Sequence, residues 1–210
     1  MRSAAPATAL RPTPACRLHA RVRPHDREST VFKLRFPSSQ VCTWAERYLN
    51  TSNDEMLRSR VRPVVRSRGY LTRDEFLEIC RWKSPRTQPW CAQNDEFTIQ
   101  TVSRAAFSTP DESLKIDLLR TMRGIEWPTA STLLHFCDRR QYPILDYRAL
   151  WSLGYSRAPR YTMAFWLAYL RFTRSLARRL GVDIGTLDRA LWQYSKERQP
   201  PPRLSVSPDR

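Results

Sequence analysis

Apolar side chains recur at helical spacing through most of the chain between residues 40 and 197. The stretches "FLEICRW" (76–82), "FTIQTVSRAAF" (97–107) and "TASTLLHFC" (129–137) each carry apolar residues three or four positions apart. Residues at that spacing share one face of an α-helix. Runs of β-branched residues, which favour strands, are scarce. The pattern therefore predicts an all-α fold.

Polar residues in front of the apolar runs predict where several helices begin. Thr72 and Glu75 have the spacing of a capping box, in which each side chain satisfies a free amide of the first turn. Asn94, which two acidic residues follow, opens the next helix. Thr109 and Pro110 are typical of an N-cap followed by proline at the first helical position.

The following stretch predicts a helix, a short glycine turn and a second helix across residues 110–138. Gly124 is expected to end the first helix in the left-handed conformation that glycine adopts without strain. Pro128 begins the second helix a few residues later. Asp146 then has the position of an N-cap for "YRALWSL", a helix that Gly154 closes.

The rest of the pattern defines one helical domain over residues 31–197. Two more helices are expected near 160–180 and 184–197, and the apolar stretch "YTMAFWLAYLRF" predicts that the first of them is buried. Residues 1–30 are basic, proline-containing and without periodicity, and residues 198–210 are proline-rich. Both ends are therefore expected to be disordered tails.

The net charge of the chain indicates the kind of partner that it binds. The 210 residues carry a formal net charge of +16, and arginine far outnumbers lysine. An excess of this size favours a polyanion such as double-stranded DNA as the partner. A solvated basic surface is the alternative, and a GC-rich gene would by itself favour arginine over lysine.

Cysteine and histidine usage sets limits on cofactors and location. The 5 cysteines form no C-x-x-C pair, and the 3 histidines lack metal-ligand spacing. We therefore expect a reduced, monomeric cytosolic protein with no disulfide, no metal and no cofactor. No run approaches the about 18 apolar residues of a membrane span, so no membrane association is expected.

The glycine turn at residue 124 has a geometry that predicts a binding site. A turn this short forces its two helices into a hairpin, and the free N–H groups of the turn and of the second helix then point outward together. Such a cluster of amides binds anions, and a DNA phosphate fits it. An ordinary helical connection with a glycine cap is the alternative.

Residues 114–154 resemble the helix-hairpin-helix DNA glycosylase superfamily, which includes endonuclease III. "MRGIEWPTA" corresponds to the hairpin motif and "PILD" to the apolar run that ends in the family's aspartate. The 18-residue gap from Pro128 to Asp146 equals the family's spacing between its lysine and its aspartate. The resemblance identifies the chain as a divergent bacterial member of this superfamily and implies a two-lobed helical fold. It also implies action in the cytosol or nucleoid on a bent DNA duplex, with one nucleotide flipped out of the stack.

The resemblance also implies that Asp146 is the catalytic residue. Cleavage of an N-glycosidic bond builds positive charge on the sugar, which a nearby carboxylate stabilises, or the carboxylate activates the attacking water. A helix N-terminus keeps such a carboxylate ionised. A plain capping role for Asp146 is the alternative.

Several positions depart from the family pattern. Pro128 stands where bifunctional members have their lysine, so no Schiff base can form there and water would be the nucleophile. Glu126 replaces a hairpin glycine and opposes phosphate binding, unless it turns away or pairs with Arg123. No cysteine follows Cys137, so the iron–sulfur cluster of some relatives is not expected.

Basic and aromatic residues complete the candidate site. We expect Trp82 and Tyr147 to line a base pocket, since aromatic rings stack on a flipped base. For Trp82 and for Trp127 on the hairpin, packing into the core is the alternative. The residues assigned to DNA binding are Lys83, Arg86, Arg123, Gly124, Ile125, Glu126, Trp127 and Thr129.

The function that follows is a DNA-binding base-excision-repair-type protein, with Asp146 as the catalytic residue of a monofunctional DNA glycosylase. The alternative is a non-catalytic DNA-binding or interaction module that keeps the scaffold, which Glu126 and Pro128 favour. A role with a small molecule or a protein partner would predict no salt-dependent affinity for DNA.

Overall fold

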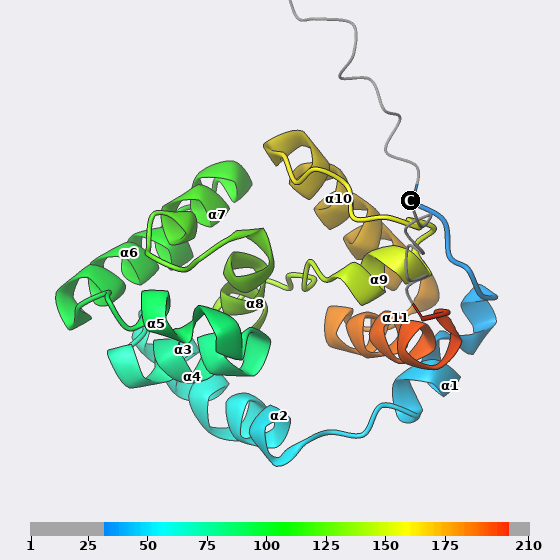
Figure 1. Cartoon of the computed structure of the whole chain (residues 1–210), viewed down its shortest axis with the longest axis horizontal. Helices are drawn as coiled ribbons and strands as arrows, with labels where there is room; N and C mark the ends of the chain where they lie inside the picture. The colour runs from blue at the N-terminus through cyan, green and yellow to red at the C-terminus, as the bar shows by residue number, and fades with distance from the viewer. Residues whose placement is uncertain (1–31, 202–210) are drawn as a thin grey trace, which may run out of the picture.

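The computed structural model describes residues 32–201, and every regular element in that range is a helix (Figure 1). The all-α prediction is therefore confirmed. The predicted disordered tail 1–30 and most of the tail 198–210 lie outside the described residues.

The helices cover most of the predicted domain. In chain order they are α1 (Val41–Glu46), α2 (Ser52–Met56), α3 (Arg62–Arg68), α4 (Arg73–Lys83), α5 (Gln88–Cys91), α6 (Glu96–Ser108), α7 (Glu112–Arg120), α8 (Trp127–Cys137), α9 (Tyr147–Ser152), α10 (Met163–Leu180) and α11 (Ile184–Arg198). Short 3-10 segments, η2 (Ser38–Gln40) and η4 (Pro85–Thr87), precede α1 and α5, and a π-helical stretch, η3 (Leu57–Val61), joins α2 to α3.

The helices gather into two groups (Figure 1). Helices α2 to α8 form one group, and the other consists of α1 together with α9, α10 and α11. The N-terminal helix α1 thus packs against the C-terminal helix α11. The chain passes between the groups after α1 and again through the connection 138–146, which runs from α8 to α9. Asp146 is the last residue of that connection.

Most of the predicted helix starts are confirmed. Thr72 and Glu75 form the complete capping box of α4, with each side chain accepting from the other residue's amide. Asp146 caps α9, since its carboxylate accepts from the Arg148 amide at 2.8 Å. At α6 the predicted start is one residue too early, because the capping side chain is that of Asp95 and not of Asn94; it accepts from the Thr98 amide at 2.7 Å.

The prediction for the start of α7 is wrong. Its cap is Asp111, whose carboxylate accepts from the amides of Ser113 and Leu114 at 2.8 and 3.0 Å. Thr109 instead ends α6 in an extended conformation. Pro110 therefore lies before the helix and not at its first position. The Asp111 carboxylate reaches two amides, which the Thr109 hydroxyl does not.

Cys80 and Cys137 are core residues, at 0% and 2% exposure. Helix α10 is amphipathic: Trp166 and Tyr169 are fully buried, whereas Arg171 is exposed. The prediction of a buried helix therefore holds for one face of α10.

A buried ion pair joins α7 to the end of α8. The Lys115 ammonium lies 2.5 Å from Asp138 and 2.7 Å from the Ala106 carbonyl oxygen. The side chains are 0% and 3% exposed. Asp138 also accepts from the Arg140 amide at 2.8 Å. The pair therefore fixes the point at which the chain leaves α8.

Replacing one partner of this pair is expected to be much more costly than replacing both. Lys115→Met leaves the Asp138 carboxylate buried without a counterion, as Asp138→Asn does for the ammonium, and each should lower the free energy of unfolding by about 3–5 kcal/mol. The double variant should lose less than either single one. Urea denaturation measures all three, and additive losses would contradict a mutual ion pair.

Candidate functional site

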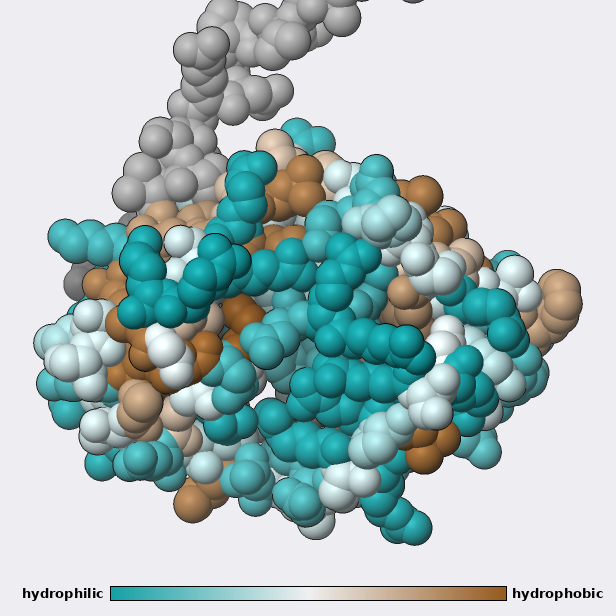
Figure 2. Space-filling view, turned by 180° about the vertical axis from the view of Figure 1, so that it is seen from behind, coloured by the Kyte–Doolittle hydropathy of each residue, from teal (hydrophilic) through white to brown (hydrophobic). Residues whose placement is uncertain are grey.

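A cavity of about 510 Å³ opens between the two groups of helices, and we call it the Asp146 cavity. Its walls come from the α1–α2 connection, α2, η3, α4, α8, the connection 138–146, α9 and α11. The lining residues used below are Tyr48, Asp54, Arg58, Trp82, Lys83, His135, Asp146, Asp188, Arg189 and Trp192. Seen from behind, hydrophilic side chains crowd the middle of the molecule between the two groups (Figure 2).

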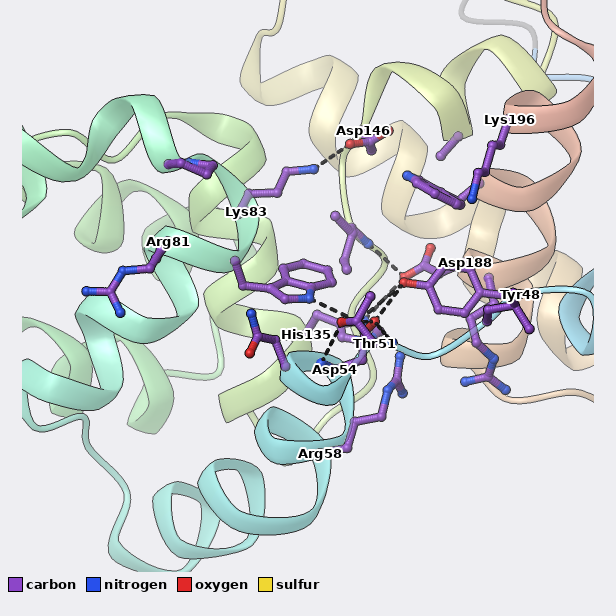
Figure 3. Close-up of a pocket in the computed structure, with 18 residues that line it drawn as sticks. Tyr48, Thr51, Asp54, Arg58, Arg81, Lys83, His135, Asp146, Asp188 and Lys196 are labelled. Atoms are coloured by element: carbon purple, nitrogen blue, oxygen red, sulfur yellow. Dashed lines mark hydrogen bonds and ion pairs between the residues drawn. The ribbon is translucent and has the colours of Figure 1, made fainter.

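Asp146 is held by two contacts at the edge of this cavity. One carboxylate oxygen accepts from the Arg148 amide, and the other lies 2.5 Å from the ammonium of Lys83 on α4 (Figure 3). The side chains of Lys83 and Asp146 are 11% and 17% exposed, so the ion pair is largely shielded from solvent. The sequence interpretation placed Lys83 on DNA, whereas the structure places it on the candidate catalytic carboxylate.

Trp82 forms one wall of the cavity and is rigidly positioned. Its indole N–H donates to Asp54 at 2.9 Å, and its ring meets Phe136 edge-on at 5.2 Å between centroids. Asp54 is 1% exposed and also accepts from the amide of Thr51 at 2.8 Å. The two sequence alternatives for Trp82 are thus combined, because the side chain closes the core and lines the cavity.

Tyr48 and Trp192 form the opposite aromatic wall. Their rings are 5.3 Å apart in an edge-to-face arrangement. The Tyr48 hydroxyl lies 3.3 Å from an oxygen of Asp54. Burial, followed by the charge of Asp54, raises the pKa of Tyr48 to about 12. The hydroxyl therefore remains neutral at ordinary pH.

A buried histidine and a buried aspartate lie at the base of the cavity. His135 Nδ1 lies 2.7 Å from the Tyr142 carbonyl oxygen and 3.2 Å from Asp188. Burial raises the pKa of Asp188, and the hydrogen bond with His135 acts in the opposite direction. Nε2 of His135 and Oδ1 of Asp188 are buried without a hydrogen-bond partner among the described residues.

Sequence reasoning did not single out Asp188, although a signal was present. Asp188 lies between Leu187 and Leu191, both buried, on the apolar face of α11. An acidic residue at such a position is rarely buried unless a partner holds it. Asp54 had a comparable signal, since Thr51 and Asp54 form a capping box for α2.

The hairpin turn between α7 and α8 presents a different surface from the one predicted. Three of the residues assigned to DNA binding, Ile125, Trp127 and Thr129, are buried at 3%, 7% and 4% exposure. Arg123 and Glu126 are exposed, and none of these five residues lines the Asp146 cavity.

Glu126 does not pair with Arg123. Its carboxylate lies 3.8 Å from the guanidinium of Arg120, which also covers the Trp127 ring at 4.0 Å. The side-chain amide of Asn94 holds the turn through two hydrogen bonds of 2.9 Å: its Nδ2 donates to the Arg123 carbonyl, and its Oδ1 accepts from the Arg123 N–H. Helix α8 begins without a side-chain cap. Amides at its start therefore remain the feature of the hairpin that suits an anion.

Gly124 has the predicted left-handed conformation, with φ of +77°. It is not the end of α7, because that helix stops at Arg120 and Gly124 lies within the turn. A methyl group on Gly124 would lie 2.9 Å from both the amide nitrogen and the sulfur of Cys91. The close approach that requires glycine is therefore to α5 inside the protein.

Arg86 and Tyr147 lie outside the Asp146 cavity. Arg86 is exposed on η4, close in sequence to Lys83. Tyr147 is 54% exposed, and its ring lies 5.1 Å from the guanidinium of Arg148. Of the two residues expected in a base pocket, only Trp82 therefore lines this cavity.

Within residues 32–201 there is no group of three or more His, Cys, Asp or Glu side chains placed to hold a metal ion. No helix in the same range has the length and apolarity needed to cross a bilayer. Comparisons with protein-family models, with curated proteins and with solved structures found no match to the chain. The resemblance of residues 114–154 therefore rests on their own motifs.

We predict that Gly124→Ala is strongly destabilising. The left-handed backbone costs a non-glycine residue about 1–2 kcal/mol, and displacing Cys91 adds a further about 1–3 kcal/mol. Gly69→Ala is the matched control, because Gly69 has φ of +84° and nothing lies within 4 Å of an added methyl group. It should cost only the backbone contribution. If the two variants lose equal amounts of unfolding free energy in thermal or urea denaturation, Cys91 moves aside at no measurable cost.

Proposed function

We propose that this protein is a DNA-binding, base-excision-repair-type protein of the helix-hairpin-helix glycosylase kind, and that it cleaves N-glycosidic bonds with Asp146. The observation that carries the proposal is the position of the Asp146 carboxylate. It lies at the start of α9 and at the edge of a cavity of about 510 Å³ with aromatic walls. A flipped base needs such a pocket and such rings.

The residues of the cavity support specific roles. Trp82, held by Asp54, presents a fixed aromatic wall for an extruded base. Asp146 stabilises the positive charge that develops on the sugar as the base departs. Pro128 provides no amine, so water completes the reaction.

The ion pair with Lys83 sets a condition on this mechanism. A unit charge at about 4 Å is worth about 4 kcal/mol near a protein surface, so an ammonium on Asp146 opposes a second positive charge there. Lys83 must therefore leave the carboxylate before the chemical step. A DNA phosphate entering the cleft is a suitable new partner for it, which reconciles the observed pair with a DNA-binding role.

The non-catalytic DNA-binding module remains the second candidate, and the same ion pair favours it. If Lys83 stays on Asp146, the charge of the carboxylate is neutralised. Asp146 then serves only to cap α9 and to join α9 to α4 through the ion pair. The exposed Glu126 on the hairpin also favours the non-catalytic module, because its negative charge opposes the binding of a phosphate at the start of α8.

Single-turnover base release separates the two candidates. Wild type, Asp146→Asn and Lys83→Gln are incubated with a panel of duplexes carrying damaged or mismatched bases. We expect release by wild type, loss of at least about a hundredfold in Asp146→Asn with DNA binding retained, and persistence in Lys83→Gln. Borohydride added during turnover should trap no protein–DNA adduct, since water is the nucleophile.

Each other outcome has a definite meaning. No release on any duplex, with binding intact, supports the non-catalytic module and leaves Asp146 as a helix cap. A borohydride adduct that Lys83→Gln abolishes would replace water by the Lys83 amine. Release that survives Asp146→Asn would remove Asp146 from the chemistry.

The DNA-binding part of the proposal has its own test. Arg86→Gln and Arg123→Gln each remove an exposed cation assigned to a phosphate, so each should reduce the slope of log affinity against log salt by close to one unit. Arg178→Gln, an exposed arginine on α10, is the control with the same change of charge. Equal slopes in all three variants would show that the DNA does not contact this surface.

A further inference from the structure

A second cavity, of about 300 Å³, adjoins the Asp146 cavity, and we call it the arginine cavity. It lies where η3 and α3 face the start of α11. Three arginines from these elements line it, together with His135 from α8; the set is Arg58, Arg62, Arg189 and His135. All but Arg62 also line the Asp146 cavity, so the two spaces share a wall.

Arg58 and Arg189 converge on one point beside Gly185, where Oδ1 of Asp183 also lies, 3.0 Å from a methyl group added to that glycine. A methyl group on Gly185 would lie 3.5 Å from Nη1 of Arg58 and 3.6 Å from Nη1 of Arg189. Burial, followed by the charge of Arg58, lowers the pKa of Arg62. Like charges held this close repel each other, and partial burial increases that cost because water screens them less. The charge of Asp183 acts in the opposite direction on the pKa of Arg62, as a counterion inside the cavity.

The protein supplies only part of the negative charge that balances the arginines. Asp183 is the acidic residue in the arginine cavity, and both of its oxygens already accept from Thr186 in capping α11. The guanidinium groups of Arg58 and Arg62 donate no hydrogen bond to any residue in the range 32–201, and Nε of Arg58 is buried without a partner. These guanidinium groups are thus free to donate to a ligand.

His135 provides an independent observation that a ligand belongs here. Its side chain is 4% exposed, its Nδ1 is engaged by the Tyr142 carbonyl, and its Nε2 has no partner among the described residues. A buried ring nitrogen without a partner is costly. Nε2 is therefore open to a hydrogen bond with a ligand, while Nδ1 faces the Tyr142 carbonyl and Asp188.

We propose that the arginine cavity binds the phosphate group of a phosphorylated small molecule, with Arg58, Arg62 and Arg189 as donors and Nε2 of His135 as a further hydrogen-bonding group. Guanidinium forks suit the paired oxygens of a phosphate. The shared wall lets the remainder of the ligand extend between Trp82 and Trp192 in the Asp146 cavity. A nucleoside monophosphate combines these parts. The site does not depend on catalysis by Asp146.

Calorimetric titration with inorganic phosphate, deoxyadenosine monophosphate and deoxyadenosine tests the proposal in a chloride buffer of constant ionic strength. We expect saturable binding of the two phosphorylated probes and at least about tenfold weaker binding of the nucleoside. Arg62→Gln should weaken phosphate binding by at least about tenfold, since it removes charge-assisted hydrogen bonds. Arg178→Gln makes the same change of charge outside both cavities and should leave binding unchanged.

Arg58→Lys is a second variant that keeps the charge and removes the fork, and it should weaken binding even if Arg62→Gln does not fold. Competition with duplex DNA identifies the source of the phosphate. Failure of DNA to displace deoxyadenosine monophosphate supports a free ligand, and displacement assigns the site to a DNA phosphate. Absence of saturable phosphate binding, or equal weakening in Arg178→Gln, would overturn the proposal. Neither result bears on base release.

Discussion

The buried Lys115–Asp138 pair fixes the connection on which the candidate site depends. Asp138 begins the connection and Asp146 ends it, and buried polar side chains hold the segment at several points between them. The Tyr142 carbonyl meets His135, the Ile144 amide donates to Asp188 at 2.9 Å, and the Leu145 amide donates to Ser131 at 2.8 Å. A segment without secondary structure of its own thereby satisfies its backbone and delivers Asp146 to one place.

This arrangement assigns the buried carboxylates to different tasks. Asp138 is matched by an ammonium and Asp54 by neutral donors, so both serve structure. Asp188 has one oxygen without a partner, and Asp146 is paired with Lys83 at the edge of the Asp146 cavity. Groups whose bonding is incomplete or replaceable are the ones free to meet a ligand. Both of these line the Asp146 cavity.

The two proposals use different sets of arginine residues. The exposed Arg86 and Arg123 are suited to a polyanion that approaches from outside, whereas the half-buried Arg58, Arg62 and Arg189 face an internal space. A formal charge of +16 does not distinguish these two uses. Burial distinguishes them. Solvent screens the charges of the exposed arginines, whereas the half-buried arginines are screened less and would be stabilised more by a bound anion.

The sequence by itself determined the all-α fold, most helix starts and the left-handed turn at Gly124, because periodicity, caps and glycine conformations act between residues close in the chain. Only the tertiary structure decided that Lys83 pairs with Asp146, its partner 63 positions away. It also decided that Gly124 packs on Cys91 and that Asp188 lies beside His135. These outcomes depend on which faces are buried against each other, and burial sums contributions from the whole fold.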